Sequence, residues 1–365
     1  MKTIKIIGIK YYVKTNKVHP MLKKTDIKEL SKDQLVLWLE RHGLESYRAL
    51  QIFKWIYHRQ TDYFETMTDL AKEARKLLSF NFLIQRLNIA KTETSVDGSI
   101  KYLFKLADGK HIESVLIPEK DHYTLCISSQ VGCAQGCKFC LTSKGGFVRN
   151  LTKGEIIAQV RDISNQAEGP KRLTNIVMMG MGEPLANYNH LIGAINVITD
   201  NDCGLRISNR RLTISTAGLV PKLRDLGRDT SANLAISLNA TDNHTRNMLM
   251  PINRQYPIEK LLEACAKYPL SSRRKITFEY ILIREVNDSE KDAKRLAKLL
   301  LPIRSKINLI PFNPFSGSGF ERPEESTIIK FKDILTQNNY TAIIRYSKGQ
   351  DISAACGQLG LTYPP

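Results

Sequence analysis

From residue 124 onward, short apolar segments alternate with longer amphipathic ones, and this alternation constrains the fold more than any other feature. It is typical of βα units around a parallel sheet, either open or closed into a barrel. The predicted strands are residues 124–129, 173–179, 211–215, 233–238, 276–281, 307–310 and 341–345. The predicted helices are residues 153–166, 190–199, 220–226, 258–268, 289–301 and 324–338.

The chain before residue 124 is interpreted as two smaller units. Residues 1–25 contain no acidic residue and form either a basic arm or a short extra strand. Ser31 and Gln34 fit a capping box that starts a helix, and residues 47–58 and 68–78 have helical patterns. Residues 102–106 and 111–118 flank Asp108-Gly109 and predict a β-hairpin. We therefore divide the chain into 1–90 (basic arm and helical accessory domain), 91–123 (hairpin extension), 124–346 (barrel) and 347–365 (C-terminal segment).

The charge balance of the 365-residue chain suggests a polyanionic partner. The formal net charge is +18, and such an excess is most often found in proteins that bind nucleic acid, although solubility alone could also explain it. For the helical accessory domain, RNA contact and a packing-only role both remain open. No apolar run approaches the length of a membrane span, and lysines interrupt the short apolar run at the N-terminus. We expect a cytoplasmic protein without a membrane partner.

Within the run CISSQVGCAQGCKFC, Cys133, Cys137 and Cys140 follow the first predicted strand with the spacing C-x₃-C-x₂-C. Three thiolates within eight residues can bind one iron–sulfur cluster, and a four-iron cluster held by three cysteines keeps one iron open. The alternative is structural zinc, which usually takes two C-x₂-C pairs. Only one such pair occurs here, and nothing in the spacing selects His190 or His244 as a fourth ligand. The pattern favours the cluster.

Polar groups follow several later strands, where a βα fold places its ligands. The run MMGMGEPL ends the second strand, and its glycines allow close approach to a ligand, while Glu183 supplies a carboxylate. Any single polar strand end is commonly an N-cap or a turn residue, but several in register indicate a binding site. The other strand-end side chains predicted to face the barrel mouth are Ser215, Ser237, Asn239 and Asn313.

Two further cysteines are predicted near this mouth. Cys356 lies between Ala355 and Gly357, so its sulfur has little steric cover. Cys126 lies on the first strand, seven residues before Cys133. A thiolate is a strong nucleophile, and a second thiol can resolve a covalent intermediate as a disulfide. The remaining two cysteines, Cys203 and Cys265, are interpreted as small buried apolar residues.

The cysteine run resembles that of the radical S-adenosylmethionine (radical SAM) superfamily. Together, CISSQVGCAQGCKFC, GFVRNLT, MMGMGEPLANY, ISTAG, LMPINRQYPIEKL, NLIPFNPF and DISAACGQL closely resemble the RlmN/Cfr group of adenine methyltransferases, from about residue 100 to residue 360. The proline in MGEPL and the run PFNPF favour the RlmN branch. The resemblance implies a partial (βα)6 radical SAM barrel, a 4Fe–4S cluster on Cys133, Cys137 and Cys140, and S-adenosylmethionine on the open iron.

The resemblance also implies a two-step mechanism. Cys356 is methylated by one S-adenosylmethionine, and a 5′-deoxyadenosyl radical made from a second takes a hydrogen from that methyl group. The carbon adds to carbon 2 of an adenosine, Glu113 of the matching HIESVLIP segment removes the carbon-2 proton, and Cys126 releases the product by forming a disulfide with Cys356. Asn239 stands where the usual SLH motif has histidine. The implied cofactor-binding residues are Gly182, Glu183, Ser215, Ser237, Leu238, Asn239 and Asn313.

The partners implied by the resemblance are 23S ribosomal RNA, free of protein or early in assembly, and tRNA. The target bases lie near the peptidyl transferase centre and 3′ of the anticodon. An electron donor such as flavodoxin or ferredoxin and a monomeric state are also expected. Two alternatives stay open: a carbon-8 methyltransferase or another radical enzyme, and a zinc-stabilised RNA-binding protein without catalysis.

Overall fold

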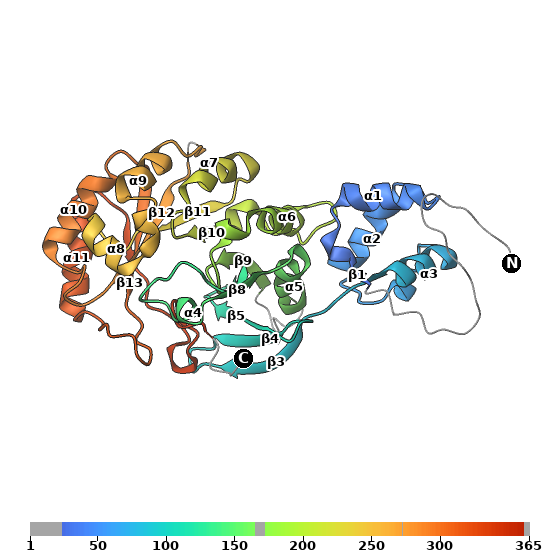
Figure 1. Ribbon diagram of the computed structural model, residues 1–365, viewed down its shortest axis with the longest axis horizontal. Helices are drawn as coiled ribbons and strands as arrows, with labels where there is room; N and C mark the ends of the chain where they lie inside the picture. Colours follow the sequence, from blue (N-terminus) through green and yellow to red (C-terminus); the bar gives the residue numbers. More distant parts are fainter. Residues whose placement is uncertain (1–23, 165–171, 272, 361–365) are drawn as a thin grey trace.

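The computed structural model describes residues 24–164, 172–271 and 273–360 (Figure 1). A small helical unit forms one end of the elongated molecule, and a larger α/β part forms the other. Most of the predicted basic arm lies outside the described residues, and so does Gln166, where the helix from Lys153 was predicted to end. The helical unit consists of α1 (Lys32–Arg41), α2 (Arg48–Tyr57) and α3 (Lys72–Asn81).

The larger part is built on one sheet of ten described strands in the order β14-β13-β12-β11-β10-β9-β6-β5-β4-β3. All neighbours from β6 to β14 are parallel, which confirms the predicted barrel strands. These strands are β6 (His122–Cys126), β9 (Arg172–Met178), β10 (Leu212–Thr216), β11 (Asn233–Ser237), β12 (Ile276–Leu282), β13 (Ser305–Pro311) and β14 (Ala342–Ile344).

Helices follow the parallel strands and cover the outer face of the sheet (Figure 1). The alternation therefore forms the predicted βα units, with β14 as the last strand. A further short helix, α8 (Asn243–Leu249), lies between β11 and α9 and was not predicted. The covering helices are α5 (Lys153–Ser164), α6 (Tyr188–Thr199), α7 (Val220–Asp229), α9 (Ile258–Ala266), α10 (Glu290–Leu300) and α11 (Glu325–Gln337).

An antiparallel extension continues the sheet from β6. The predicted hairpin is present as β4 (Ile100–Lys105) and β5 (His111–Pro118), and β5 pairs antiparallel with β6. A third strand that was not predicted, β3 (Asn88–Thr94), pairs with β4 at the outer edge. Its sequence, NIAKTET, is mostly polar and exposed, so it lacks the apolar alternation of a core strand. Charged residues on an edge strand discourage pairing with other chains.

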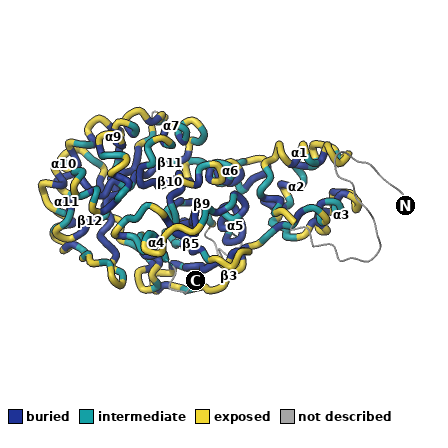
Figure 2. The backbone as a smooth tube through the Cα atoms, in the orientation of Figure 1, coloured by how far each residue is buried: buried dark blue, intermediate teal, exposed yellow. Residues whose placement is uncertain are grey.

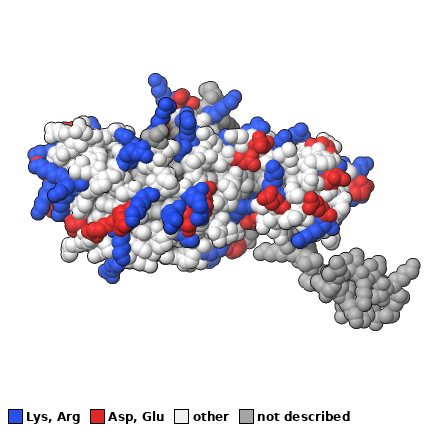
Figure 3. All heavy atoms as spheres, turned by 90° about the horizontal axis from the view of Figure 1, so that it is seen from above, with Lys and Arg blue, Asp and Glu red and all other residues white. Residues whose placement is uncertain are grey.

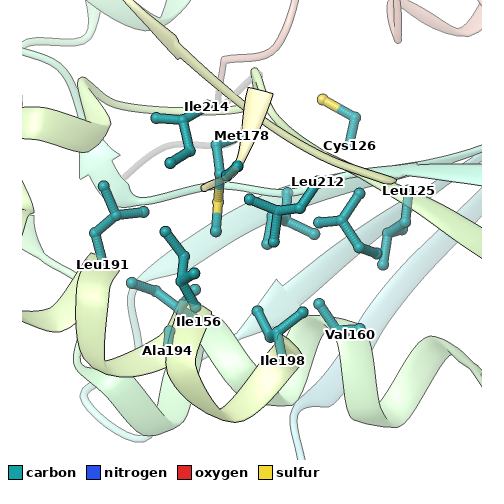
Figure 4. Close-up of a cluster of buried hydrophobic side chains, with 14 of the residues drawn as sticks. Leu125, Cys126, Ile156, Val160, Met178, Leu191, Ala194, Ile198, Leu212 and Ile214 are labelled. Atoms are coloured by element: carbon teal, nitrogen blue, oxygen red, sulfur yellow. The ribbon is translucent and has the colours of Figure 1, made fainter. Parts of the chain in front are cut away.

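Neighbouring residues on β6 face opposite sides of the sheet. Figure 4 shows Leu125 packed among the apolar side chains of α5 and α6, while the sulfur of Cys126 points away from them. Successive side chains of a strand alternate between its two faces, and the outer face is covered by helices. Cys126 therefore points into the barrel. The sheet and the inward sides of its helices form a continuous buried core (Figure 2).

Buried charges hold the helical unit against α5. Arg161 is fully buried, and its guanidinium contacts Asp162 at 2.9 Å and Asp62 at 2.7 Å. Its Nε also donates to the carbonyl oxygen of Ile56 on α2 at 3.0 Å. Removing one partner of such a buried pair typically costs about 3–5 kcal/mol. This helical unit is thus fixed to the barrel by specific contacts rather than only by the chain connection.

Basic side chains are spread over the face seen in Figure 3 and are densest at the end remote from the helical unit. Acidic side chains lie among them, so this face carries no single basic stripe. None of the helices in the described ranges has the length and apolar character needed to span a bilayer.

Candidate active site

The cysteine loop, residues 130–150, is closed by a short two-stranded ladder that the sequence did not predict. Here β7 (Gln130–Gly132) pairs antiparallel with β8 (Phe147–Asn150). The backbone N–H of Cys133 donates to the carbonyl oxygen of Gly146 at 2.8 Å. This ladder keeps the three cysteines at the carboxyl end of β6, where parallel βα folds bind ligands.

The three cysteines line one pocket of about 150 Å³, called the cysteine pocket below. Burial raises the pKa of Cys133 to about 11 and raises that of Cys137 as well. Among residues 24–164, 172–271 and 273–360, no three His, Cys, Asp or Glu side chains are grouped so that they could hold a metal ion. The other lining residues that the sequence predicted are Gly182, Glu183, Ser215, Ser237, Asn239 and Cys356.

This arrangement fits a 4Fe–4S cluster better than a structural zinc ion. Zinc draws four ligands to about 2.0–2.3 Å from one centre. In a four-iron cluster each cysteine binds a different iron, so the sulfurs line a space without converging on a point. Cys133, Cys137 and Cys140 line one pocket, and in the described residues they do not form a group that could hold a single metal ion.

Glu183 presents a fixed carboxylate at the end of β9. The carboxylate is buried, and it accepts backbone N–H groups of Leu185 at 3.0 Å and Ala217 at 2.8 Å. A carboxylate offers about four lone pairs, so it can still accept from an ammonium group. Gly182 before it has φ +102°, and a Cβ there would lie 2.5 Å from the side chain of Gln130. Only glycine lets the backbone pass this close to the cysteine loop.

The predicted cofactor residues on and directly after β10 and β11 differ in whether they reach the cysteine pocket. Ser215 and Ser237 line the cysteine pocket, whereas Leu238 is fully buried and does not line it. Asn239 also lines the pocket, but its Oδ1 accepts the backbone N–H of Ile281 at 2.8 Å. Its backbone has φ +57°, a conformation that asparagine tolerates better than most residues. The side chain of Asn239 thus ties β11 to β12.

The C-terminal segment brings Cys356 to the cysteine pocket. Cys356 is exposed toward two spaces: the cysteine pocket and a second cavity of about 430 Å³ inside the barrel, called the barrel cavity below. Cys126 lines this barrel cavity, as its inward direction on β6 requires. Cys126 and Cys356 thus line the same cavity. Desolvation by the surrounding protein raises the pKa of both the Cys126 and the Cys356 thiol.

Two predicted residues hold the C-terminal segment without lining either space. Asn313 Nδ2 donates to the carbonyl oxygen of Cys356 at 3.0 Å. Glu113 on β5 accepts the backbone N–H of Gly360 at 2.9 Å and faces Lys101 Nζ at 3.6 Å. Burial raises the pKa of Glu113. In this conformation the Glu113 carboxylate contacts the C-terminal segment rather than the cysteine pocket.

Two buried residues at the site were not predicted. Arg246 donates to the carbonyl oxygens of Ala217 at 2.8 Å and Leu238 at 3.0 Å, and so links the ends of β10 and β11. Glu279 lies in the middle of β12 and lines both spaces. Its position inside the apolar run ITFEYIL was the available signal, because a carboxylate is rarely buried without a reason.

Comparison with known proteins agrees with this architecture. A profile of the Radical SAM superfamily matches residues 127–297, and one of the "Ribosomal RNA large subunit methyltransferase N-terminal domain" matches residues 25–84. The chain is 59% identical to the "Dual-specificity RNA methyltransferase RlmN" of Desulfosudis oleivorans, covering 92% of this chain and 90% of that protein. It is 54% identical to the protein of the same name from Geobacter sulfurreducens, covering 92% and 91%.

A solved structure shows the same fold. The "radical SAM methyltransferase from Sphaerobacter thermophilus" superposes with a TM-score of 0.87 at 43% identity, over 92% of this chain and 99% of that one. At this identity and coverage the likeness includes the helical unit, the antiparallel extension and the barrel.

Proposed function

Because the chain belongs to the RlmN family of radical SAM RNA methyltransferases, we propose that it methylates carbon 2 of one adenosine in 23S ribosomal RNA and of the adenosine 3′ of the anticodon in tRNA. The observation that carries the proposal is the position of Cys356. It lies between the cysteine pocket and the cavity that contains Cys126. A methyltransferase that moved its methyl group directly from cofactor to RNA would need neither thiol.

The cysteine pocket supplies the ligands for the cofactors. Cys133, Cys137 and Cys140 would hold a 4Fe–4S cluster and leave one iron for S-adenosylmethionine. When bound, these groups supply the methyl group and a 5′-deoxyadenosyl radical. The pocket offers the Glu183 carboxylate to an ammonium group. We assign cofactor contacts to the pocket-lining residues Gly182, Glu183, Ser215, Ser237 and Asn239. Of the other two residues that the resemblance implied, Leu238 supports the pocket from behind its lining and Asn313 acts by holding Cys356.

Cys356 and Cys126 divide the thiol chemistry. Cys356 receives a methyl group, carries the carbon to the adenosine and becomes covalently joined to the RNA. The Cys126 thiolate then attacks the Cys356 sulfur. A disulfide bond forms, the bond from that sulfur to the RNA-bound carbon breaks, and the carbon takes up a proton, so that the methylated RNA leaves. Thiol attack on sulfur requires both atoms to approach one another, and their shared cavity supports this. Carbon 2 of adenine is not nucleophilic, which is why a radical route is needed.

Glu113 is the proposed base for the carbon-2 proton. A buried carboxylate with a raised pKa is a better proton acceptor near neutral pH than an exposed one. Its Oε2 is occupied by the backbone N–H of Gly360. The role therefore requires the C-terminal segment to shift when RNA is bound.

The remaining assignments concern domains and partners. We propose that residues 1–90 present RNA to the barrel, that residues 91–123 join the two, that residues 124–346 carry the cofactors and that residues 347–365 carry the methyl-accepting thiol. Docking of the helical unit through Arg161 supports a fixed orientation for bound RNA. A flavodoxin or ferredoxin would supply electrons to a cytoplasmic monomer.

Nucleoside analysis tests the proposal. The protein is reconstituted anaerobically with iron and sulfide and incubated with S-adenosylmethionine, a reductant and unmodified 23S ribosomal RNA or tRNA. Digested RNA is expected to contain 2-methyladenosine, and the Cys356→Ala variant is expected to produce none. Formation of 8-methyladenosine, or of no methylated adenosine by the unmodified protein, would overturn the proposed reaction.

A further inference from the structure

Glu279 is a buried carboxylate at the centre of the site. It lies on β12, is 6% exposed, and lines both the cysteine pocket and the barrel cavity. Cys356 lines the same two spaces. In the described ranges, the one hydrogen bond to the Glu279 carboxylate comes from Asn308 Nδ2 to Oε1 at 2.9 Å. The second carboxylate oxygen remains available to a group in these spaces.

Charged groups and thiols from several elements share the barrel cavity with Glu279. Lys306 on β13 and Arg345 after β14 also line the barrel cavity and favour the charged carboxylate, but neither forms a salt bridge with it in the described residues. The thiols of Cys356 and Cys126 line the same cavity. Burial outweighs the two cations and raises the pKa of Glu279, and the carboxylate in turn helps to raise the pKa of Cys356. An incompletely paired buried carboxylate is costly, which points to a function.

Methylation of a thiol requires a proton acceptor. Neither space is lined by a histidine, and the lining carboxylates in the described chain are Glu183, Glu119 and Glu279. Glu183 lines only the cysteine pocket, and both of its oxygens accept backbone N–H groups. Glu119 lines only the barrel cavity and faces Lys348 at 3.6 Å. Glu279 alone among them shares both spaces with Cys356.

We propose that Glu279 accepts the proton of the Cys356 thiol when that sulfur is methylated. This inference rests on the proposed function. The S–H bond of Cys356 breaks and its proton moves to the Glu279 carboxylate, which becomes a carboxylic acid. The sulfur electron pair forms the new bond to the methyl carbon, and the bond from that carbon to the sulfonium sulfur breaks, leaving S-adenosylhomocysteine. The acid later returns its proton to solvent.

The first experiment measures the thiol without cofactors. The full-length chain is produced without its cluster, mass spectrometry checks that Cys356 is unmodified, and iodoacetamide labelling of Cys356 is followed from pH 6 to pH 10. If Glu279 accepts the proton, Glu279→Gln labels about tenfold more slowly than the unmodified protein at pH 7, and the two rates converge once the thiol is ionised. The charge of Glu279 also raises the pKa of Cys356, so if this repulsion outweighs proton acceptance, Glu279→Gln labels faster, and the proposal is overturned.

The second experiment measures methyl transfer in the reconstituted protein as the mass increase of the peptide that contains Cys356. Glu279→Gln is expected to slow this step by about 100-fold or more, and Glu279→Asp to restore part of the rate. Glu119→Gln removes a carboxylate from the barrel cavity alone and is expected to match the unmodified protein. Equal rates for Glu279→Gln and the unmodified protein would contradict the proposal.

The two proposals fail in different ways. If the unmodified protein never methylates Cys356, the proposed function is wrong, whereas the labelling result still reports on Glu279. If the unmodified protein methylates Cys356 and Glu279→Gln does so equally fast, only the role of Glu279 is wrong. Glu279→Gln keeps an acceptor oxygen for Asn308, and thermal unfolding of each variant checks that the fold is retained.

Discussion

The cysteine loop and the C-terminal segment bring sulfur to the same pocket, but different kinds of contact hold them. The loop is closed by its own ladder between β7 and β8, within about twenty residues. The C-terminal segment is held by residues far away in sequence: Lys101 Nζ donates to the carbonyl oxygen of Ile352 at 2.6 Å, and Asn313 holds Cys356. Figure 1 shows this segment, in red, beside α4 (Leu141–Lys144) and the antiparallel extension.

The contacts that position the three loop cysteines therefore differ from those that position Cys356. The ladder of the loop is local, but other elements also hold the loop. The backbone N–H groups of Gln130 and Lys138 donate to the carbonyl oxygens of Met181 at 3.1 Å and Leu249 at 3.0 Å. The position of Cys356 depends on β4, β5 and the loop after β13 all being in place. Variants in the loop are thus expected to remove chemistry, whereas variants around the C-terminal segment are expected to change stability and the position of Cys356.

The largest effect is expected for Cys137→Ala. Loss of one of the three cysteine ligands should remove most of the bound iron. It should also abolish formation of 5′-deoxyadenosine and methylation of RNA, both measured by chromatography. The matched control is Cys203→Ala, which removes a buried cysteine beside Asp200. Full activity and iron content in the Cys137 variant would show that the loop does not hold the cluster.

The Cys126→Ala and Cys356→Ala variants are expected to differ in whether they form a covalent adduct with RNA. Cys126→Ala should accumulate a covalent RNA–protein adduct, because the carbon is transferred but not released. Cys356→Ala should form none, because the carbon is never loaded. Denaturing gels with labelled RNA distinguish the two results. An adduct in the Cys356 variant would refute the assigned division of roles.

A large loss of stability is expected for Lys101→Met. Its buried ammonium lies between Glu113 and Glu93 and holds Ile352. Removing it leaves the buried Glu113 without its cation, which should cost about 3–5 kcal/mol in the free energy of unfolding. The control Lys91→Met removes the more exposed partner of the same Glu93 and should cost about 0–1 kcal/mol. Urea denaturation measures both.

If the two lysine variants lose similar stability, the antiparallel extension does not anchor the C-terminal segment. Proteolysis offers a second measurement, since cleavage after residue 345 should become faster in Lys101→Met and stay unchanged in Lys91→Met.

The smallest effect is expected where the two regions touch. Gly357 has φ +83°, and a Cβ there would lie 2.9 Å from the carbonyl oxygen of Phe139 in the cysteine loop. Gly357→Ala should therefore cost about 1–2 kcal/mol for the left-handed backbone plus the cost of that collision. Gly319 has φ +69° with open space around it, so Gly319→Ala reports the backbone cost alone. Equal losses of stability in the two variants would mean that the segment is not pressed against the loop.

Much of the fold could be predicted because its signals are local. The alternation of strands and helices, the capping box at Ser31 and the hairpin at Asp108-Gly109 are all present. The strand β3 was missed because it is polar and exposed, and is a strand only through its pairing with β4. The ladder of β7 and β8 was missed because each strand is too short to show a period.

Some residues of the candidate site could also be predicted from local sequence signals, and others could not. Glycine and carboxylate in MGEPL and the three clustered cysteines are recognisable from spacing. Glu279 and Arg246 are single polar residues within or near apolar runs, and a satisfied structural role is an equally good explanation of each from sequence alone. The structure shows that Arg246 donates to three strand-end carbonyl groups, whereas Glu279 keeps one oxygen available.

By itself the sequence determined the βα architecture, the cysteine loop and the family, because periodicity and short spacings are properties of neighbouring residues. Only the tertiary structure decided that Cys126, Cys356 and Glu279 share one cavity. The two-residue repeat of a β-strand shows which residues lie on the same face. It does not show which face points into the barrel or which elements cover that face. The direction of each face depends on how β6 and β12 lie in the barrel. What covers the inner face depends on where the C-terminal segment docks, and contacts between residues more than two hundred positions apart determine that docking.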